Sequence, residues 1–93
     1  MSQNLMPILV KPDDVIALKK AAFALGKNYK TIRRWCKEYK LARQASKNAP
    51  LEISYPALMM VAHGDIDALE ALRSGNRTDP RVTRYFDHLG IPI

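Results

Sequence analysis

Two amphipathic helical patterns, joined by only two or three residues, constrain this chain most. The first pattern runs from Asp13 or Asp14 to a stop at Gly26, and its apolar set includes the i, i+3, i+4, i+7 spacing of one helix face: Ile16, Leu18, Ala21, Ala22 and Leu25. Asn28 is a suitable N-cap for a second helix from about Tyr29 to Tyr39, and the same spacing recurs there at Ile32, Trp35, Cys36 and Tyr39. A short connection that contains glycine predicts a helix-turn-helix, in which the first helix holds the second out from the body.

The second helix carries positive charge on the faces that its apolar stripe leaves free. Helical periodicity turns Lys30, Arg33, Arg34 and Lys37 outward while Ile32, Trp35 and Tyr39 anchor inward. Residues 19–47 contain ten Lys or Arg and one acid, Glu38, a net charge of +9, whereas the rest of the chain carries −3. Ordinary exposed helices mix both signs, so this imbalance indicates a surface for a polyanion, with nucleic acid as the leading partner.

The remaining segments predict a small wing and further helices. Turn residues between two short extended stretches, near Leu41–Ala45 and Leu51–Ile53, favour a hairpin. Ser54 can cap a nearly all-apolar helix, Asp65 or Asp67 opens another that closes at Gly75, and Asp79–Pro80 starts a last one that stops at Gly90. We therefore expect a mainly α fold with a β-hairpin wing. Its predicted parts are an arm over residues 1–12 with a short strand at Ile8–Val10, a winged helix-turn-helix domain over 13–75, and a C-terminal helical extension over 76–93.

The last helix has an apolar face with no obvious need inside so small a domain. Its members share the i, i+3, i+4, i+7 spacing: Val82, Tyr85, Phe86 and Leu89. Two interpretations are open, an oligomerisation surface and packing within the molecule. Three nearby arginines, Arg77, Arg81 and Arg84, could also extend a phosphate-binding surface.

Other classes of function find little support. The 93 residues contain no apolar run of membrane-spanning length and no signal peptide, which predicts a cytoplasmic protein. The single cysteine, Cys36, is expected to act as a small hydrophobe, and two distant histidines, His63 and His88, provide no metal-ligand spacing. We find no nucleophile, base and oxyanion arrangement, so neither an enzyme nor a bound cofactor or metal is expected.

The segment LKKAAFALGKNYKTIRRWCKEYKL, residues 18–41, resembles the winged helix-turn-helix of the MerR and phage-excisionase group. The similarity rests on paired alanines at Ala21 and Ala22, on Leu25–Gly26, and on the run from Thr31 to Trp35; with the hairpin it covers about residues 16–63. It implies a recognition helix in the major groove and a wing on the backbone or minor groove, with Lys47 near the wing tip. The chain lacks the long dimerisation helix of MerR regulators and is similar in size to excisionases, or recombination directionality factors. Excisionases bind tandem sites cooperatively and bend DNA near an integrase.

We therefore expect an architectural, sequence-specific binder of double-stranded DNA, nucleoid-associated, that self-associates on DNA and directs integrase-mediated excision from a mobile element. The residues expected to contact DNA lie on the second helix, its end and the wing: Tyr29, Lys30, Thr31, Arg33, Arg34, Lys37, Lys40, Arg43 and Lys47. Either arginine of the pair Arg33 and Arg34 could contact a guanine bidentately, while lysines more often neutralise phosphates. A small terminase subunit or a transcriptional repressor could use the same module. From a different class, an antitoxin-like module could cover an acidic protein with this helix.

Overall fold

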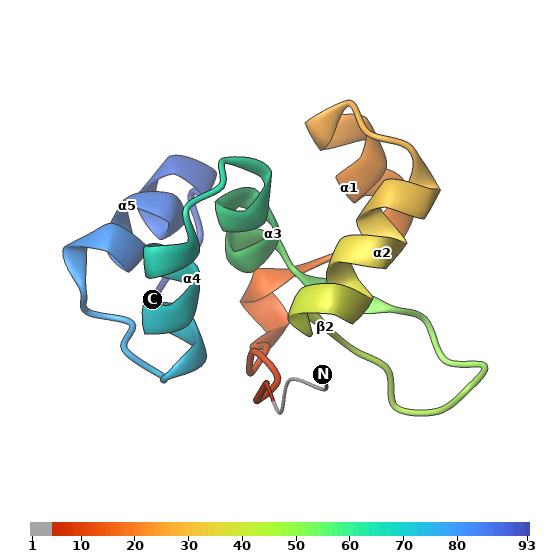
Figure 1. The fold of residues 1–93 in the computed structure, drawn as a ribbon, viewed down its shortest axis with the longest axis horizontal. Helices are drawn as coiled ribbons and strands as arrows, with labels where there is room; N and C mark the ends of the chain where they lie inside the picture. Colours follow the sequence, from red (N-terminus) through yellow and green to blue (C-terminus); the bar gives the residue numbers. More distant parts are fainter. Residues whose placement is uncertain (1–4) are drawn as a thin grey trace.

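The computed structural model describes residues 5–93 and is mainly helical with one small antiparallel sheet (Figure 1). A 3-10 turn at Pro12–Asp14 precedes the first strand. The remaining elements follow in chain order: β1 Val15–Ile16, α1 Leu18–Leu25, α2 Tyr29–Tyr39, β2 Ala42–Arg43, β3 Glu52–Ser54, α3 Tyr55–Ala62, α4 Ile66–Arg73 and α5 Pro80–Leu89. The predicted mainly α class with a β-hairpin is confirmed at this level.

The sheet brings together strands that are distant in the sequence. Its order is β1-β3-β2, so β3 lies in the centre and pairs with both neighbours in antiparallel fashion. Ile16 lies opposite Ile53 in the register, and Ile53 also lies opposite Ala42 from the other side. The prediction that Ile16 belongs to the first helix was therefore wrong, because its backbone pairs with β3 and the helix begins only at Leu18.

The two helices of the basic segment have the predicted connection. Gly26 ends α1 in the left-handed region with φ 63°, a conformation that costs glycine little because it has no Cβ. The Asn28 side chain accepts a hydrogen bond of 2.9 Å from the backbone N–H of Thr31 and so caps α2, whose bounds match the prediction. At the other end Lys40 takes a left-handed conformation with φ 55°, which turns the chain into β2.

The three later helices begin at the caps that the sequence predicts. In each helix the side chain of the capping residue accepts a hydrogen bond from a backbone N–H of the first turn. The pairs are Ser54 with Ala57 in α3, Asp65 with Ala68 in α4 and Asp79 with Arg81 in α5. These helices pack against one another, with α4 and α5 on the side of the molecule away from α1 and with α3 in the centre, where it also contacts α2 (Figure 1).

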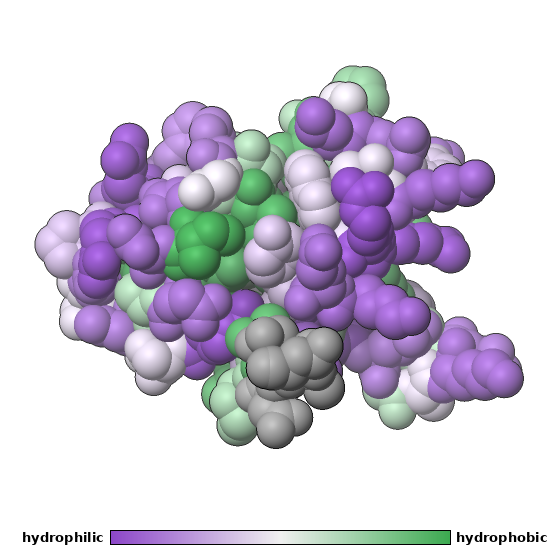
Figure 2. Space-filling view, viewed as in Figure 1, coloured by the Kyte–Doolittle hydropathy of each residue, from purple (hydrophilic) through white to green (hydrophobic). Residues whose placement is uncertain are grey.

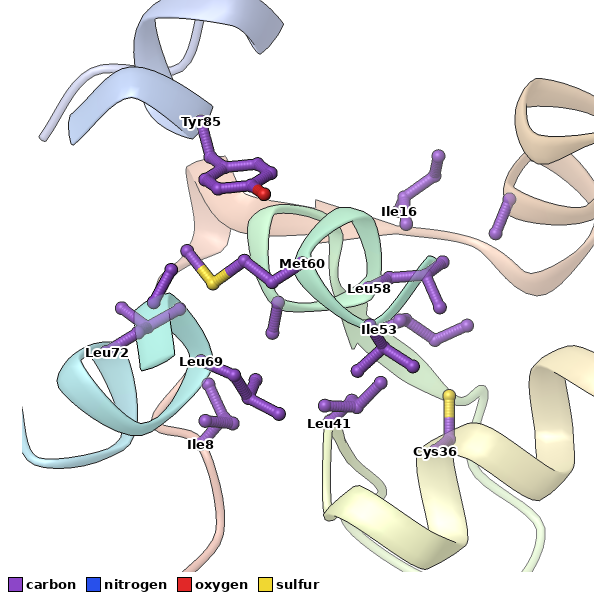
Figure 3. Close-up of a cluster of buried hydrophobic side chains, with 14 of the residues drawn as sticks. Ile8, Ile16, Cys36, Leu41, Ile53, Leu58, Met60, Leu69, Leu72 and Tyr85 are labelled. Atoms are coloured by element: carbon purple, nitrogen blue, oxygen red, sulfur yellow. The ribbon is translucent and has the colours of Figure 1, made fainter. Parts of the chain in front are cut away.

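One hydrophobic core joins all parts of the fold, with α3 at its centre (Figure 3). Leu58 and Met60 of α3 are fully buried, and the core extends to Ile32 of α2 on one side and to Phe86 of α5 on the other. The side chains of Val82, Tyr85 and Phe86 are all buried in this core. The proposed oligomerisation face on α5 must be corrected accordingly: three of its members are covered by the chain's own core, and Leu89 is half-buried.

The described part of the N-terminal arm, residues 5–11, lies against the domain without forming the strand expected at Ile8–Val10. Ile8 and Val10 are buried, but the Ile8 N–H donates to Lys40 O at 3.0 Å outside any ladder. Residues 1–4 of the predicted arm lie outside the described residues. Within residues 5–93, no helix combines the length and the apolar character needed to cross a bilayer.

Candidate nucleic-acid interface

The outer face of α2 carries four exposed cations. Ile32 is fully buried and Cys36 is 7% exposed, and together they fix which way the helix faces. As a result Lys30, Arg33, Arg34 and Lys37 turn to solvent. Figure 2 shows hydrophilic side chains projecting on the side where Figure 1 places α2 and the loop between β2 and β3.

These cations lack acidic neighbours. Over residues 5–93, nine of the ten basic residues between Lys19 and Lys47 have no carboxylate within 4.0 Å. The exception is Arg43, whose Nε lies 2.6 Å from Glu52 and whose Nη1 donates to Val10 O at 2.9 Å. Arg43 therefore connects the hairpin to the arm, and its guanidinium is less available to an external anion than the sequence predicts.

The C-terminal arginines are arranged in the opposite way. Arg77 binds the buried carboxylate of Asp14 at 2.7 Å and lies 5.1 Å above the ring of Phe86, and Arg81 pairs with Asp79 at 2.8 Å. Arg77 is therefore held by a buried carboxylate and does not extend the basic surface, whereas Arg81 is 58% exposed and pairs with Asp79 two residues before it. Arg84 is exposed, with its guanidinium 6.0 Å from the ring centre of Tyr85. The unpaired positive charge is thus concentrated on the α1, α2 and hairpin side.

A groove of about 800 Å³ separates α2 from the loop between β2 and β3. Arg33 and Lys37 line its helix side and Lys47 its loop side, while Cys36 and Leu51 contribute to the lining between them. This arrangement places cations on both rims of an open groove with apolar residues in it. Such a groove can hold an extended anionic polymer through charge at the rims and apolar contact inside.

The loop that carries Lys47 is braced by a residue that the sequence analysis missed. Gln44 Nε2 donates to Ala49 O at 2.7 Å and to Lys47 O at 3.4 Å, and the Ala49 N–H donates to Ser46 O at 3.1 Å. These bonds close the loop on itself and keep Lys47 at the groove. A glutamine in a turn-rich segment carries no local sequence signal for this role, because the amide can equally point to water.

Near the start of α2 the structure exposes two aromatic residues. Tyr29 is 49% exposed, as expected for a contact residue, whereas Thr31 is half-buried and its N–H already bonds to Asn28. Phe23 of α1 is 90% exposed and shares a shallow groove of about 460 Å³ with Tyr29, Lys19 and others. Phe23 was not among the predicted contact residues. At the far end of the helix, Lys40 presents its side chain to solvent while its carbonyl bonds the arm.

The surroundings of Cys36 keep its thiol protonated. Burial disfavours the thiolate and raises the pKa of Cys36 to about 11.

His63 and His88 both line a separate hollow of about 560 Å³ beside Tyr85 on the opposite side of the core. Among residues 5–93, no three His, Cys, Asp or Glu side chains lie close enough together to hold a metal ion.

Comparison with known proteins adds no family name. No protein-family model matches this chain, and neither a curated protein nor a solved structure is significantly similar to it.

Proposed function

We propose that this chain is a sequence-specific binder of double-stranded DNA that inserts α2 into the major groove. The observation that carries the proposal is the separation of charge: within residues 5–93 the cations of α2 have no carboxylate within 4.0 Å, while Arg73, Arg77 and Arg81 at the other end are all in ion pairs. A duplex carries one negative charge per about 1.7 Å of its axis, so unpaired cations along a helix are matched to phosphates.

The hairpin would act as a wing, which makes the DNA-binding unit a winged helix-turn-helix. With α2 in the major groove, the sugar-phosphate strand beside it would run in the groove between Arg33, Lys37 and Lys47. Arg33 and Arg34 are the candidates for base contacts, since a guanidinium can bind guanine O6 and N7 together.

In the cell we propose the role of an excisionase from an integrative mobile element, nucleoid-associated and acting beside an integrase. The support for this role is the resemblance in residues 16–63 together with the small size and the basic charge of the chain. Because the apolar face of α5 is buried, copies that assemble on tandem sites would have to meet through other surfaces.

The DNA-binding proposal is tested with two charge-matched double variants. Duplex affinity is measured by fluorescence anisotropy across a range of salt concentrations for Arg33→Ala with Lys37→Ala, and for Arg81→Ala with Arg84→Ala. Each pair removes two positive charges, but only the first pair lies on α2. We expect the first variant to bind more weakly and to reduce the slope of log K against log salt by about 1 for each phosphate contact that is lost, while the second stays near the wild type. Equal losses in both variants, or wild-type binding that salt barely affects, would contradict the proposal.

The excisionase role needs a separate measurement. Full-length protein should bind a fragment with several selected sites more tightly than a fragment with one site, and gel mobility of circularly permuted fragments should report a bend. Identical affinity per site without a bend would leave a simple repressor as the better interpretation. Capture of a large terminase subunit instead of an integrase would favour a role in DNA packaging.

A further inference from the structure

The side chain of Arg73, the last residue of α4, joins three segments that are far apart in the sequence. Its Nε lies 3.0 Å from both carboxylate oxygens of Glu70, its Nη1 donates to Met6 O of the arm, and its Nη2 donates to Tyr39 O at 2.9 Å. The side chain is only 6% exposed, although it is charged. A buried guanidinium directed at main-chain oxygens is not placed to contact a phosphate.

Tyr39 is the last residue of α2, which gives this contact its importance. The last four carbonyls of a helix have no partner within the helix, and a cation near them is also favoured by the helix dipole. Arg73 supplies both effects from a different element. Beside it, the arm binds the next carbonyl, since the Ile8 N–H donates to Lys40 O at 3.0 Å.

The rest of α2 is held along one side only. Its buried residues, Ile32 and Cys36, lie on a single stripe, and Trp35 and Tyr39 beside them are half-buried. The stripe sets which face of α2 turns outward, and the hydrogen bond from Arg73 adds a directional restraint at the C-terminal end of the helix, because a hydrogen bond has a preferred geometry whereas apolar burial is not directional.

We propose that Arg73 is a positioning residue, which fixes the C-terminal end of α2 against α4 and so sets the orientation of Arg33 and Arg34 for base contacts. Arg73 orients α2 whether or not the protein binds DNA, whereas the effect of this orientation on base contacts rests on the DNA-binding function proposed above. Arginine suits this role because its planar fork presents donors to three partners at once, whereas lysine has a single nitrogen.

The test compares Arg73→Lys with Arg77→Lys. Both variants keep the net charge, and both arginines donate to an arm carbonyl, Arg77 to Leu9 O at 3.4 Å. Only Arg73 contacts α2. The probes are a duplex selected from a random pool by the wild-type protein and a scrambled duplex of the same composition, with binding measured well below the melting temperature of each variant.

We expect Arg73→Lys to reduce the ratio of selected to scrambled affinity by at least about fivefold, the smallest loss expected for one bidentate base contact. The salt dependence on scrambled DNA should not change, because no phosphate contact is lost. Arg77→Lys should lower the melting temperature but keep the ratio. An unchanged ratio in Arg73→Lys, or equal losses in the two variants, would overturn the positioning role.

A measurement without DNA separates this inference from the proposed function. The chain has one tryptophan, Trp35, and it lies half-buried on α2. If Arg73 orients α2, the emission maximum of Trp35 should shift in Arg73→Lys and not in Arg77→Lys. A shift in a protein that does not bind DNA would refute the function and keep the orientation, whereas no shift with normal DNA binding would refute the orientation alone.

Discussion

At the scale of single residues, similar side chains have different roles according to their partners. Arg33 and Arg43 belong to the same basic block, yet Arg33 faces solvent while Arg43 is bound to Glu52 and Val10 O. Charge counting along the sequence predicts the block but cannot separate these two arginines, because the partners of Arg43 lie 9 and 33 residues away.

Trp35 was expected in the core and is only half-buried. Its replacement by alanine should therefore lower the free energy of unfolding by less than the about 3–5 kcal/mol lost with a fully buried tryptophan.

The buried thiol of Cys36 provides the first prediction. A pKa of about 11, against the ordinary thiol value of 9.0, lowers the thiolate fraction at pH 8 about a hundredfold, because each pKa unit is a factor of ten. Native protein should therefore react with a disulfide reagent at least about a hundredfold more slowly than protein unfolded in urea. The rates are followed by the absorbance of the released thiolate. Equally fast reaction in the folded state would place Cys36 at an accessible surface instead.

Tyr85 predicts a specific loss of stability at high pH. Burial, and then the hydrogen bond of 2.8 Å to Asp65, raise its pKa from 10.0 to about 12. A folded-state pKa above the unfolded value favours folding fully below about pH 10, and this contribution disappears as the pH rises towards 12. Urea unfolding at pH 8 to 11 should therefore show a steeper loss for the wild type than for Tyr85→Phe. Parallel curves for the two proteins would contradict the assignment.

At the scale of secondary structure, the sequence predicts those boundaries that depend on neighbouring residues. Asn28, Ser54 and Asp79 all cap the helices expected of them, because a cap and its first turn lie within four residues. The start of α1 was misplaced because Ile16 is an apolar residue just before the helical pattern that begins at Leu18, while its strand partner Ile53 lies beyond the whole basic segment. The arm was misassigned for a similar reason: its carbonyls bind arginines of β2 and α4, and such contacts leave no pattern in the arm's own sequence.

The cap of α2 gives a prediction at this scale. Asn28→Ala removes the acceptor for the Thr31 N–H and should lower the free energy of unfolding by about 1 kcal/mol. Fraying of the first turn should also weaken the proposed binding to DNA, since Tyr29 and Lys30 lie there. Asn48→Ala, in the exposed loop, is the matched control and should change neither value. Chemical denaturation measures the free energy of unfolding, and fluorescence anisotropy measures the affinity for DNA. An equal loss of stability in Asn48→Ala would contradict the specific role of the Asn28 cap.

At the scale of the whole molecule, the C-terminal helix belongs to the same core as the basic segment. The sequence suggested a DNA-binding domain over residues 13–75 followed by a C-terminal helical extension over 76–93, and Val82 and Phe86 of this extension are fully buried in the common core. Patterning identified the apolar face of α5 correctly and could not say what covers it, because an internal and an external partner need the same side chains.

Removal of α5 is therefore expected to unfold the protein. A chain that ends after Gly75 loses Val82 and Phe86 from a core that is already small for 93 residues. Circular dichroism should show no cooperative thermal transition for it, while a chain lacking only the exposed Pro92 and Ile93 should melt like the wild type. A cooperative thermal transition in the chain that ends after Gly75 would show that residues 1–75 fold without α5 and would contradict this prediction.

The uneven distribution of ion pairs also has a kinetic consequence. Residues 19–47 carry a net charge of +9 and the rest of the chain −3, and within residues 5–93 the cations of α2 have no carboxylate partner while Arg77 and Arg81 do, so the charge distribution is dipolar with its positive end on the α2 side. A polyanion would rotate this dipole during approach, so a larger fraction of diffusive collisions would meet the duplex with α2 in front. The association rate constant should fall steeply as ionic strength rises, while the dissociation rate constant should change much less.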